Sequence, residues 1–193
     1  MKKTVLAAVV AFILTFPEIA AAFCPPGLPQ ILEGADHGDP DSEYVLGYIY
    51  MTGCYDNHDP AEAVRWWRKA AEQGNVQAQV ALGGAYGSGE GTYRDYAEAA
   101  RWFRRAAEQG DAQAQFELGK AYYLGNGVIQ DYAEAAGWYR KSAEQGFAPS
   151  QTAIGTMYVM GLGVERNIST ARHWLQTACT KGDQHSCDML RKL

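Results

Sequence analysis

The side chains in this sequence with the clearest chemical potential are its four cysteines, Cys24, Cys54, Cys179 and Cys187. Cys179 and Cys187 flank His185, and two thiolates with an imidazole at short spacing suit a zinc ion. An even number of cysteines in an exported protein instead favours disulfide bonds. Because the surrounding pattern offers no fourth ligand, disulfides are the preferred interpretation, and a metal-binding module is the alternative.

Patterns typical of enzymes are weak elsewhere in the chain. The four histidines are scattered, and no Gly-x-Ser-x-Gly nucleophile motif occurs. The glycine-rich segment 87–91 follows no predicted strand, which makes a phosphate-binding role weak. Pairs of carboxylates occur only where helices are expected to begin, and there they have a capping role. The sequence therefore predicts a protein without catalytic residues and without a cofactor.

The first 22 residues have the three parts of a secretory signal peptide. Lys2 and Lys3 precede 13 uncharged, mostly apolar residues (4–16), and Ala20-Ala21-Ala22 provides a cleavage site. A membrane anchor is the alternative, but a spanning helix needs about 20 apolar residues. A lipoprotein signal at Cys24 is disfavoured by the large Phe23. We expect cleavage after residue 22, no stable membrane insertion afterwards, and a location in the periplasm of a Gram-negative bacterium or outside the cell.

The chain is mildly acidic, with a net charge of −5 over 193 residues. This charge gives no electrostatic attraction to nucleic acid or to anionic lipid. We therefore expect no nucleic acid as a partner. The expected partner is a protein or peptide, and the chain is expected to be a monomer.

A period of 36 residues organises the sequence from residue 38 onwards. It is marked by five evenly spaced glycines, Gly38, Gly74, Gly110, Gly146 and Gly182. A fixed period of about 20–50 residues indicates a repeat array, in which each unit buries its apolar face against its neighbours. Such arrays usually bind other molecules rather than transform them.

Each period predicts two helices joined by a turn. In the unit 111–146, Asp111 opens a first helix with an apolar face, and the glycines of segment 125–127 end it. Asp131 opens a second helix, with Glu134 placed to complete a capping box. The same box recurs in the two preceding units as Asp59/Glu62 and Asp95/Glu98.

Several columns of equivalent residues indicate tight packing. One column is aromatic in every unit: Trp66, Trp102, Trp138 and Trp174. We interpret it as core rather than as a cofactor site. A second column places glycine in the middle of each first helix, where it costs about 1 kcal/mol relative to alanine: Gly47, Gly83, Gly119 and Gly155. We expect a close approach of another helix at these glycines.

The repeated motifs carry a family resemblance. Ala-x-x-x-Leu-Gly-x-x-Tyr, Gly-x-Gly-Val, Asp-x-x-x-Ala-x-x-Trp and Ala-Ala-x-x-Gly resemble the Sel-one-like repeat (SLR) family, relatives of tetratricopeptide repeats (TPR). The resemblance implies an all-α fold, a right-handed α/α solenoid of helix–turn–helix repeats that forms an SLR/TPR-like superhelix. The expected organisation is a signal peptide (1–22), a capping half repeat (23–38), four repeats spanning 39–182 (39–74, 75–110, 111–146 and 147–182) and a capping helix (183–193).

The cysteines lie in the terminal units of this array. Cys179 takes the position of Ala143 near the end of a second helix, and Cys187 takes that of Gln115 near the start of the next first helix. The two helices are antiparallel neighbours, and this spacing resembles the helix-bridging disulfides of the cysteine-rich secreted branch of the family. The pairs expected by this resemblance are Cys24–Cys54 and Cys179–Cys187. Terminal units lack a neighbour on one side, so a covalent bond contributes most there.

The resemblance also implies a binding face. In tetratricopeptide arrays the first helix of each hairpin lines the concave face, which here gives a list of candidate partner-binding residues: Tyr44, Tyr48, Met51, Gln77, Val80, Gln113, Phe116, Lys120, Tyr123, Thr152 and Thr156. Aromatic residues beside glutamines suit a peptide or a partner helix. The alternative for Phe116 and Tyr123 is packing against adjacent hairpins.

The expected function is therefore that of an exported, non-catalytic scaffold or adaptor that holds a protein or peptide on its concave face. Some members of the cysteine-rich branch have been credited with β-lactam binding or β-lactamase activity, and this is the alternative. A serine enzyme of that class would carry Ser-x-x-Lys and Lys-Thr-Gly, and the sequence contains neither.

Overall fold

The computed structural model describes residues 24–193, so the predicted signal peptide lies outside the described residues. The described chain is helical and divides into two compact units, residues 24–94 and 95–193. The helices of the first unit are α3 (Leu28–Asp36), α4 (Pro40–Thr52), the short 3-10 helix η1 (Cys54–Asp56), α5 (Pro60–Glu72) and α6 (Val76–Ser88). Those of the second unit are α7 (Tyr96–Glu108), α8 (Ala112–Leu124), α9 (Tyr132–Glu144), α10 (Ala148–Met160), α11 (Ile168–Thr180) and α12 (Gln184–Leu190).

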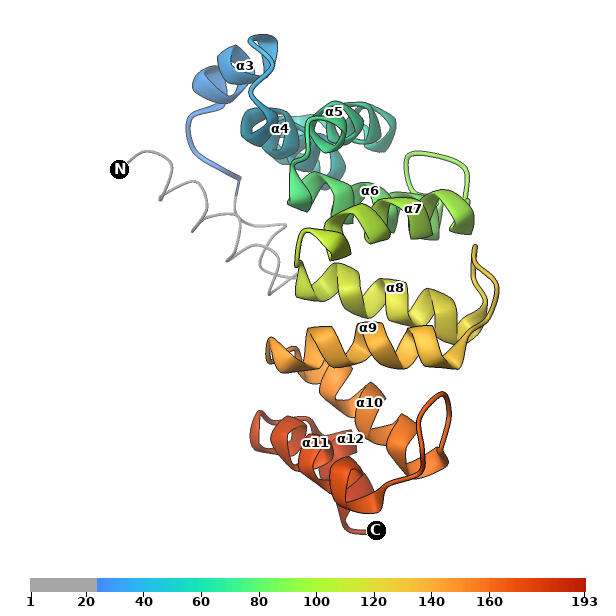
Figure 1. Cartoon of the computed structure of the whole chain (residues 1–193). Coiled ribbons are helices and arrows are strands. Elements are labelled where there is room, and N and C mark those ends of the chain that lie inside the picture. The colour runs from blue at the N-terminus through green and yellow to red at the C-terminus, as the bar shows by residue number, and fades with distance from the viewer. Residues whose placement is uncertain (1–23) are drawn as a thin grey trace. The chain divides into compact units, whose positions relative to one another are not determined.

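Within each unit, every helix packs on the next one along the chain. In the second unit the contacts run from α7 to α8 and onwards to α12, and Figure 1 shows these helices stacked in chain order. In the first unit α3 packs on α4, α4 on α5, and α5 on α6. Together with the repeat pattern, this arrangement is an all-α solenoid, as the sequence predicted.

The helix boundaries follow from capping residues that the repeat supplies. Asp111 accepts a hydrogen bond from Ala114 N (2.7 Å), and Gly125 ends α8 in the left-handed conformation. Asp131 accepts from the backbone of Ala133 and Glu134. α10 lacks such a cap because Phe147 stands at the capping position.

The predicted capping box forms only in its aspartate half. Asp95 Oδ1 accepts from the backbone N–H groups of Ala97 (2.9 Å) and Glu98 (3.1 Å). The Glu98 carboxylate instead accepts a hydrogen bond from Arg101 (2.8 Å), three residues further along the same helix. An exposed i,i+3 pair of this kind adds only a few tenths of a kcal/mol.

The mid-helix glycines mark close approaches, as predicted. A Cβ atom added at Gly47 would lie 2.5 Å from the Trp67 ring, and one at Gly119 would lie 2.8 Å from the Tyr139 ring. At Gly155 the neighbour is Leu175. At these three glycines, the first helix therefore receives a large side chain from the second helix of its own hairpin.

The tightly packed aromatic column is displaced by one residue from the tryptophan column that the sequence suggested. Trp67 and Tyr139 are buried (6% and 5% exposed), and Trp67 Nε1 donates to Tyr44 O (3.2 Å). In the tryptophan column itself Trp102 is buried, whereas Trp66, Trp138 and Trp174 are half-buried. On two of the half-buried rings a cation from three residues later lies over the ring: Lys69 is 3.7 Å from the centre of Trp66, and Lys141 is 4.0 Å from that of Trp138.

The loop glycines explain a departure in the first repeat. A Cβ at Gly127 would lie 2.0 Å from Tyr96 O, because the loop presses on the first turn of the preceding second helix. The first repeat follows only a half repeat, whose helix α3 begins at Leu28 and lacks the equivalent first turn. There Tyr55 replaces the glycine, and it has a positive φ of 59°. Its hydroxyl donates to Pro25 O, while the adjacent Cys54 is bonded to Cys24. The residues before α3 thus stand where a full second helix would have its first turn.

Candidate functional site

Three of the predicted partner-binding residues are exposed in the structure: Gln77 on α6, and Gln113 and Lys120 on α8. Lys120 Nζ lies 3.2 Å from Glu117 Oε2 in an i,i+3 ion pair, which leaves half of the lysine side chain accessible. Met51 and Val80 are half-buried. Polar groups of the first helices are therefore accessible within each unit.

The prediction is wrong for Tyr44, which belongs to the core. Its side chain is 5% exposed, and burial raises its pKa. The physical reason is that Tyr44 lies on the side of α4 that neighbouring helices cover, so its side chain is removed from solvent. Tyr48, one turn later, is half-buried, and its hydroxyl has no hydrogen-bond partner among residues 24–193.

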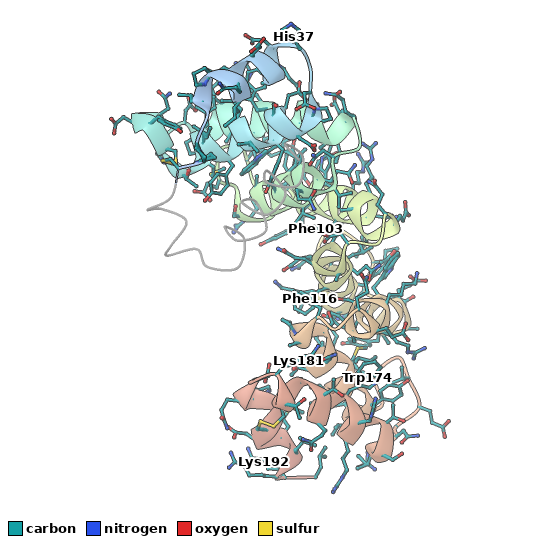
Figure 2. All side chains as sticks on the ribbon, turned by 90° about the vertical axis from the view of Figure 1, so that its left-hand side faces the viewer. His37, Phe103, Phe116, Trp174, Lys181 and Lys192 are labelled. Carbon is teal, nitrogen blue, oxygen red and sulfur yellow. A yellow bond between two sulfur atoms is a disulfide. The ribbon has the colours of Figure 1, made fainter. Side chains whose placement is uncertain are left out.

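Phe116 and Tyr123 take part in packing. The Phe116 ring lies 5.6 Å from that of Tyr139 and 5.5 Å from that of Phe147, at the start of the next first helix. Tyr123 meets Tyr132 edge to face at 5.3 Å. Both side chains stay half-buried, so an alanine at either position would remove packing as well as any contact with a partner. Figure 2 shows Phe116 on the ribbon of α8.

Thr152 and Thr156 face the terminal helix. Thr152 Oγ1 lies 2.8 Å from Ser186 Oγ and donates to Asp183 Oδ2 (3.2 Å), and Thr156 Oγ1 lies 3.6 Å from Met189 Sδ. Their hydroxyl groups therefore join α10 to α12. In the second unit, Gln113 and Lys120 are therefore the main accessible residues of the candidate face.

Sequence reasoning did not identify a column of glutamines that joins successive repeats. Gln115 Nε2 donates to Ala107 O (3.1 Å), eight residues earlier, and Gln151 Nε2 donates to Ala143 O at the same distance. Gln145 Nε2 then donates to Gln115 Oε1 (2.8 Å). The recurrence of glutamine at this position was the available signal, but periodicity alone does not reveal the partner of an amide.

Both expected disulfides are present. Cys24 is bonded to Cys54 (Cα–Cα 5.4 Å), and Cys179 is bonded to Cys187 (Cα–Cα 4.9 Å); the bond at the C-terminal end is visible in Figure 2. The two sulfurs beside His185 are therefore engaged with each other and are not available as thiolate ligands. Across residues 24–193, no group of three or more His, Cys, Asp or Glu side chains is placed to hold a metal ion.

The acidic side chains at helix starts serve the helices themselves. The carboxylates of Asp59, Asp95 and Asp131 each accept two backbone N–H groups. A buried acid does occur at Glu43, which is 3% exposed and accepts from Gln73 Nε2 (2.7 Å). Burial raises the pKa of Glu43 above its ordinary value of 4.5, although the charge of Lys69 and the bond from Gln73 act in the opposite direction.

A model of the Sel1 repeat matches residues 40–75, 76–111, 112–147 and 148–183. The chain belongs to the Sel1 repeat family. The matched units begin one residue later than the units that we defined from the glycines. Sel1 repeat proteins are generally non-enzymatic scaffolds for protein–protein interaction.

Solved structures of Sel1 repeat proteins are similar to this chain. The protective antigen c5321 of uropathogenic Escherichia coli, which has an SLR fold, is 44% identical with a TM-score of 0.83 over 84% of this chain and 35% of its own. A Sel1 repeat protein from Oxalobacter formigenes is 31% identical with a TM-score of 0.81, over 90% of this chain and 71% of its own. The chain thus spans about a third of the length of the first protein.

A third structure shares the fold alone. Cysteine rich protein B of Helicobacter pylori is 22% identical with a TM-score of 0.56, over 72% of this chain and 99% of its own. A comparison with curated proteins gave no match. Within residues 24–193, no helix has both the length and the apolar character needed to cross a membrane.

Proposed function

We propose that this Sel1 repeat protein is an exported, non-catalytic scaffold that binds a protein or peptide through the face formed by its first helices, the concave face in tetratricopeptide arrays. The observation that carries the proposal is the exposure of Gln113 and Lys120 on α8 beside half-buried aromatic residues. Side-chain amides can bond to the backbone of a bound segment, and the aromatic edges provide apolar area. The face differs in residue type from one repeat to the next, as a recognition surface requires.

Export is supported by the two disulfides and by the N-terminal sequence pattern. Disulfides persist in oxidising compartments, such as the periplasm or the extracellular space. The acidic net charge argues against nucleic acid as the partner. We propose that the chain acts as a monomer in one of these compartments.

The test is affinity capture from an envelope fraction with chemical crosslinking, followed by mass spectrometry. Replacing Lys120 with glutamate should remove the captured partner, because it reverses a charge at an exposed position of the proposed face. Lys192→Glu is the matched control, since it makes the same charge change at an exposed position beyond α12. Equal capture by both variants would place the binding surface elsewhere.

A further inference from the structure

A second, separate binding site is indicated on α7, a second helix. A surface cavity of about 590 Å³ lies along this helix and extends to the loop at Gly127 and Val128. Alanines of α7 and Val128 give it small apolar walls, and its charged lining consists of Arg101, Arg104, Arg105, Glu98 and Glu108. All of these residues belong to the unit 95–193.

One lining residue of the cavity, Trp102, carries a buried donor that lacks a partner. Trp102 is 6% exposed, and its Nε1 has no hydrogen-bond partner within residues 24–193. An indole nitrogen only donates, so the missing partner must be an acceptor. Leaving such a donor unsatisfied costs free energy, which a ligand acceptor would recover.

The arginines add further donors and no acceptors. The Arg105 guanidinium stacks on the Trp102 ring, 4.6 Å from its centre, and Arg104 donates to Tyr122 Oη (2.6 Å). Arg101 is paired with Glu98 (2.8 Å). Arg105, placed over the indole ring, has no carboxylate partner in the described part of the chain, and its guanidinium is a planar fork that suits a carboxylate.

This combination is found on α7 alone among the second helices. At the positions of Arg101, Arg104 and Arg105, each of the other helices carries at least one different residue: Arg65, Arg68 and Lys69 on α5, Gly137, Arg140 and Lys141 on α9, and His173, Gln176 and Thr177 on α11. The tryptophans equivalent to Trp102 are only half-buried. The three arginines beside a buried tryptophan are therefore specific to α7, whereas the bonds from arginine to tyrosine and from arginine to glutamate recur on α5.

We propose that the cavity on α7 binds a carboxylate group, with Trp102 Nε1–H and the Arg105 guanidinium as its donors. Three arginines and two glutamates leave the lining with one net positive charge, which matches a singly charged carboxylate better than a doubly charged phosphate. The carboxylate is either a terminal one, that of a small organic acid or of a peptide C-terminus, or that of an acidic side chain, and the experiment below distinguishes these two kinds.

The test follows the indole N–H resonance of Trp102 by two-dimensional NMR of the ¹⁵N-labelled chain, assigned with Trp102→Phe. N-acetyl-phenylalanine, which mimics a free acid or a C-terminus, should move this resonance in a saturable way, and its amide should not. The blocked peptide Ac-Ala-Glu-Ala-NH₂ and its glutamine counterpart test the acidic side chain. Whichever carboxylate saturates at the lower concentration identifies the source.

Arg105→Gln should lower the affinity for the tighter-binding probe about tenfold or more, because a charge-assisted hydrogen bond is lost. Lys141→Gln removes the equivalent cation from Trp138 on α9 and should leave the binding unchanged, while circular dichroism checks that both variants fold. The proposal is overturned if no carboxylate moves the Trp102 resonance, if the amide and glutamine probes act equally, or if inorganic phosphate saturates at a lower concentration.

Discussion

Gln115, in an inner repeat, and Cys187, in the C-terminal cap, occupy equivalent positions but join the helices differently. Gln115 reaches the carbonyl of Ala107, eight residues earlier, by a hydrogen bond of 3.1 Å, whereas Cys187 forms a covalent bond with Cys179, also eight residues earlier. An inner junction is stabilised by repeats on both sides, so a hydrogen bond suffices. A terminal junction has a neighbour on one side only, and a disulfide compensates for the missing contacts.

The N-terminal end differs from the inner repeats at the same position. Glu43 stands where the inner repeats have glutamine, and it accepts from Gln73 as Gln115 accepts from Gln145. The Cys24–Cys54 disulfide and the bond from Tyr55 to Pro25 lie at the same end. The comparison teaches that the ends keep the positions of the inner repeats but carry different residue types there.

The largest expected effect comes from removing a terminal disulfide. Replacing Cys24 and Cys54 by serine should lower the free energy of unfolding by about 3–4 kcal/mol, and replacing Cys179 and Cys187 by about 2–3 kcal/mol, because the first bond closes the longer loop. Urea denaturation of both double variants measures the difference. Losses well below 1 kcal/mol in both would show that the ends need no covalent bond.

Next in size is the effect of a side chain at an inner loop. Gly127→Ala should cost about 3 kcal/mol, since the new Cβ would overlap Tyr96 O at 2.0 Å in a backbone with φ 73°. Gly125→Ala is the matched control, because φ is 74° there but the nearest atom is 3.3 Å away. It should cost about 1 kcal/mol. Equal losses in urea denaturation would mean that the loop does not press on α7.

A smaller effect is expected where the C-terminal cap departs from the inner pattern. Gln151 Oε1 is buried and has no partner in the described chain, because Lys181 stands where Gln145 stands one repeat earlier, and the lysine donates to Gly146 O (2.6 Å). Lys181→Gln should provide the missing donor and raise the stability by about 1 kcal/mol. Thermal unfolding measures the change, with Lys192→Gln as the control for loss of charge. A destabilised Lys181→Gln variant would contradict this view of the junction.

The smallest effect concerns pH at the other end. Since burial raises the pKa of Glu43 in the folded state, its protonated form favours folding, and that contribution is lost as the pH rises through the folded pKa. Glu43→Gln should therefore stabilise the protein at pH 7 by less than about 1 kcal/mol. The gain should shrink below about pH 4.5, the ordinary pKa of this carboxyl group. Urea titrations at several pH values test this. A gain in stability that grows on acidification would contradict the expected pH dependence.

Much of the fold could be read from the period. Gly119 predicted a close helix approach and Asp131 a helix start, since both depend on local backbone geometry or on contacts within one hairpin. The candidate site was predicted less well. Tyr44 and Phe116 lie on the helical face that the sequence assigned to a partner, but neighbouring helices cover part of that face. Helical spacing predicts the direction of a side chain but not which other helix lies in that direction.

The sequence by itself determined the 36-residue repeat, the helical hairpin and the position of the cysteines in the two terminal units, because each of these is set by local propensity and by spacing along the chain. Only the tertiary structure decided that Trp67 packs at Gly47, that Gln115 reaches Ala107 and that Trp102 keeps an unsatisfied N–H beside Arg105. These features depend on which side chains fill the space between two helices. That space exists only once the hairpins have packed together.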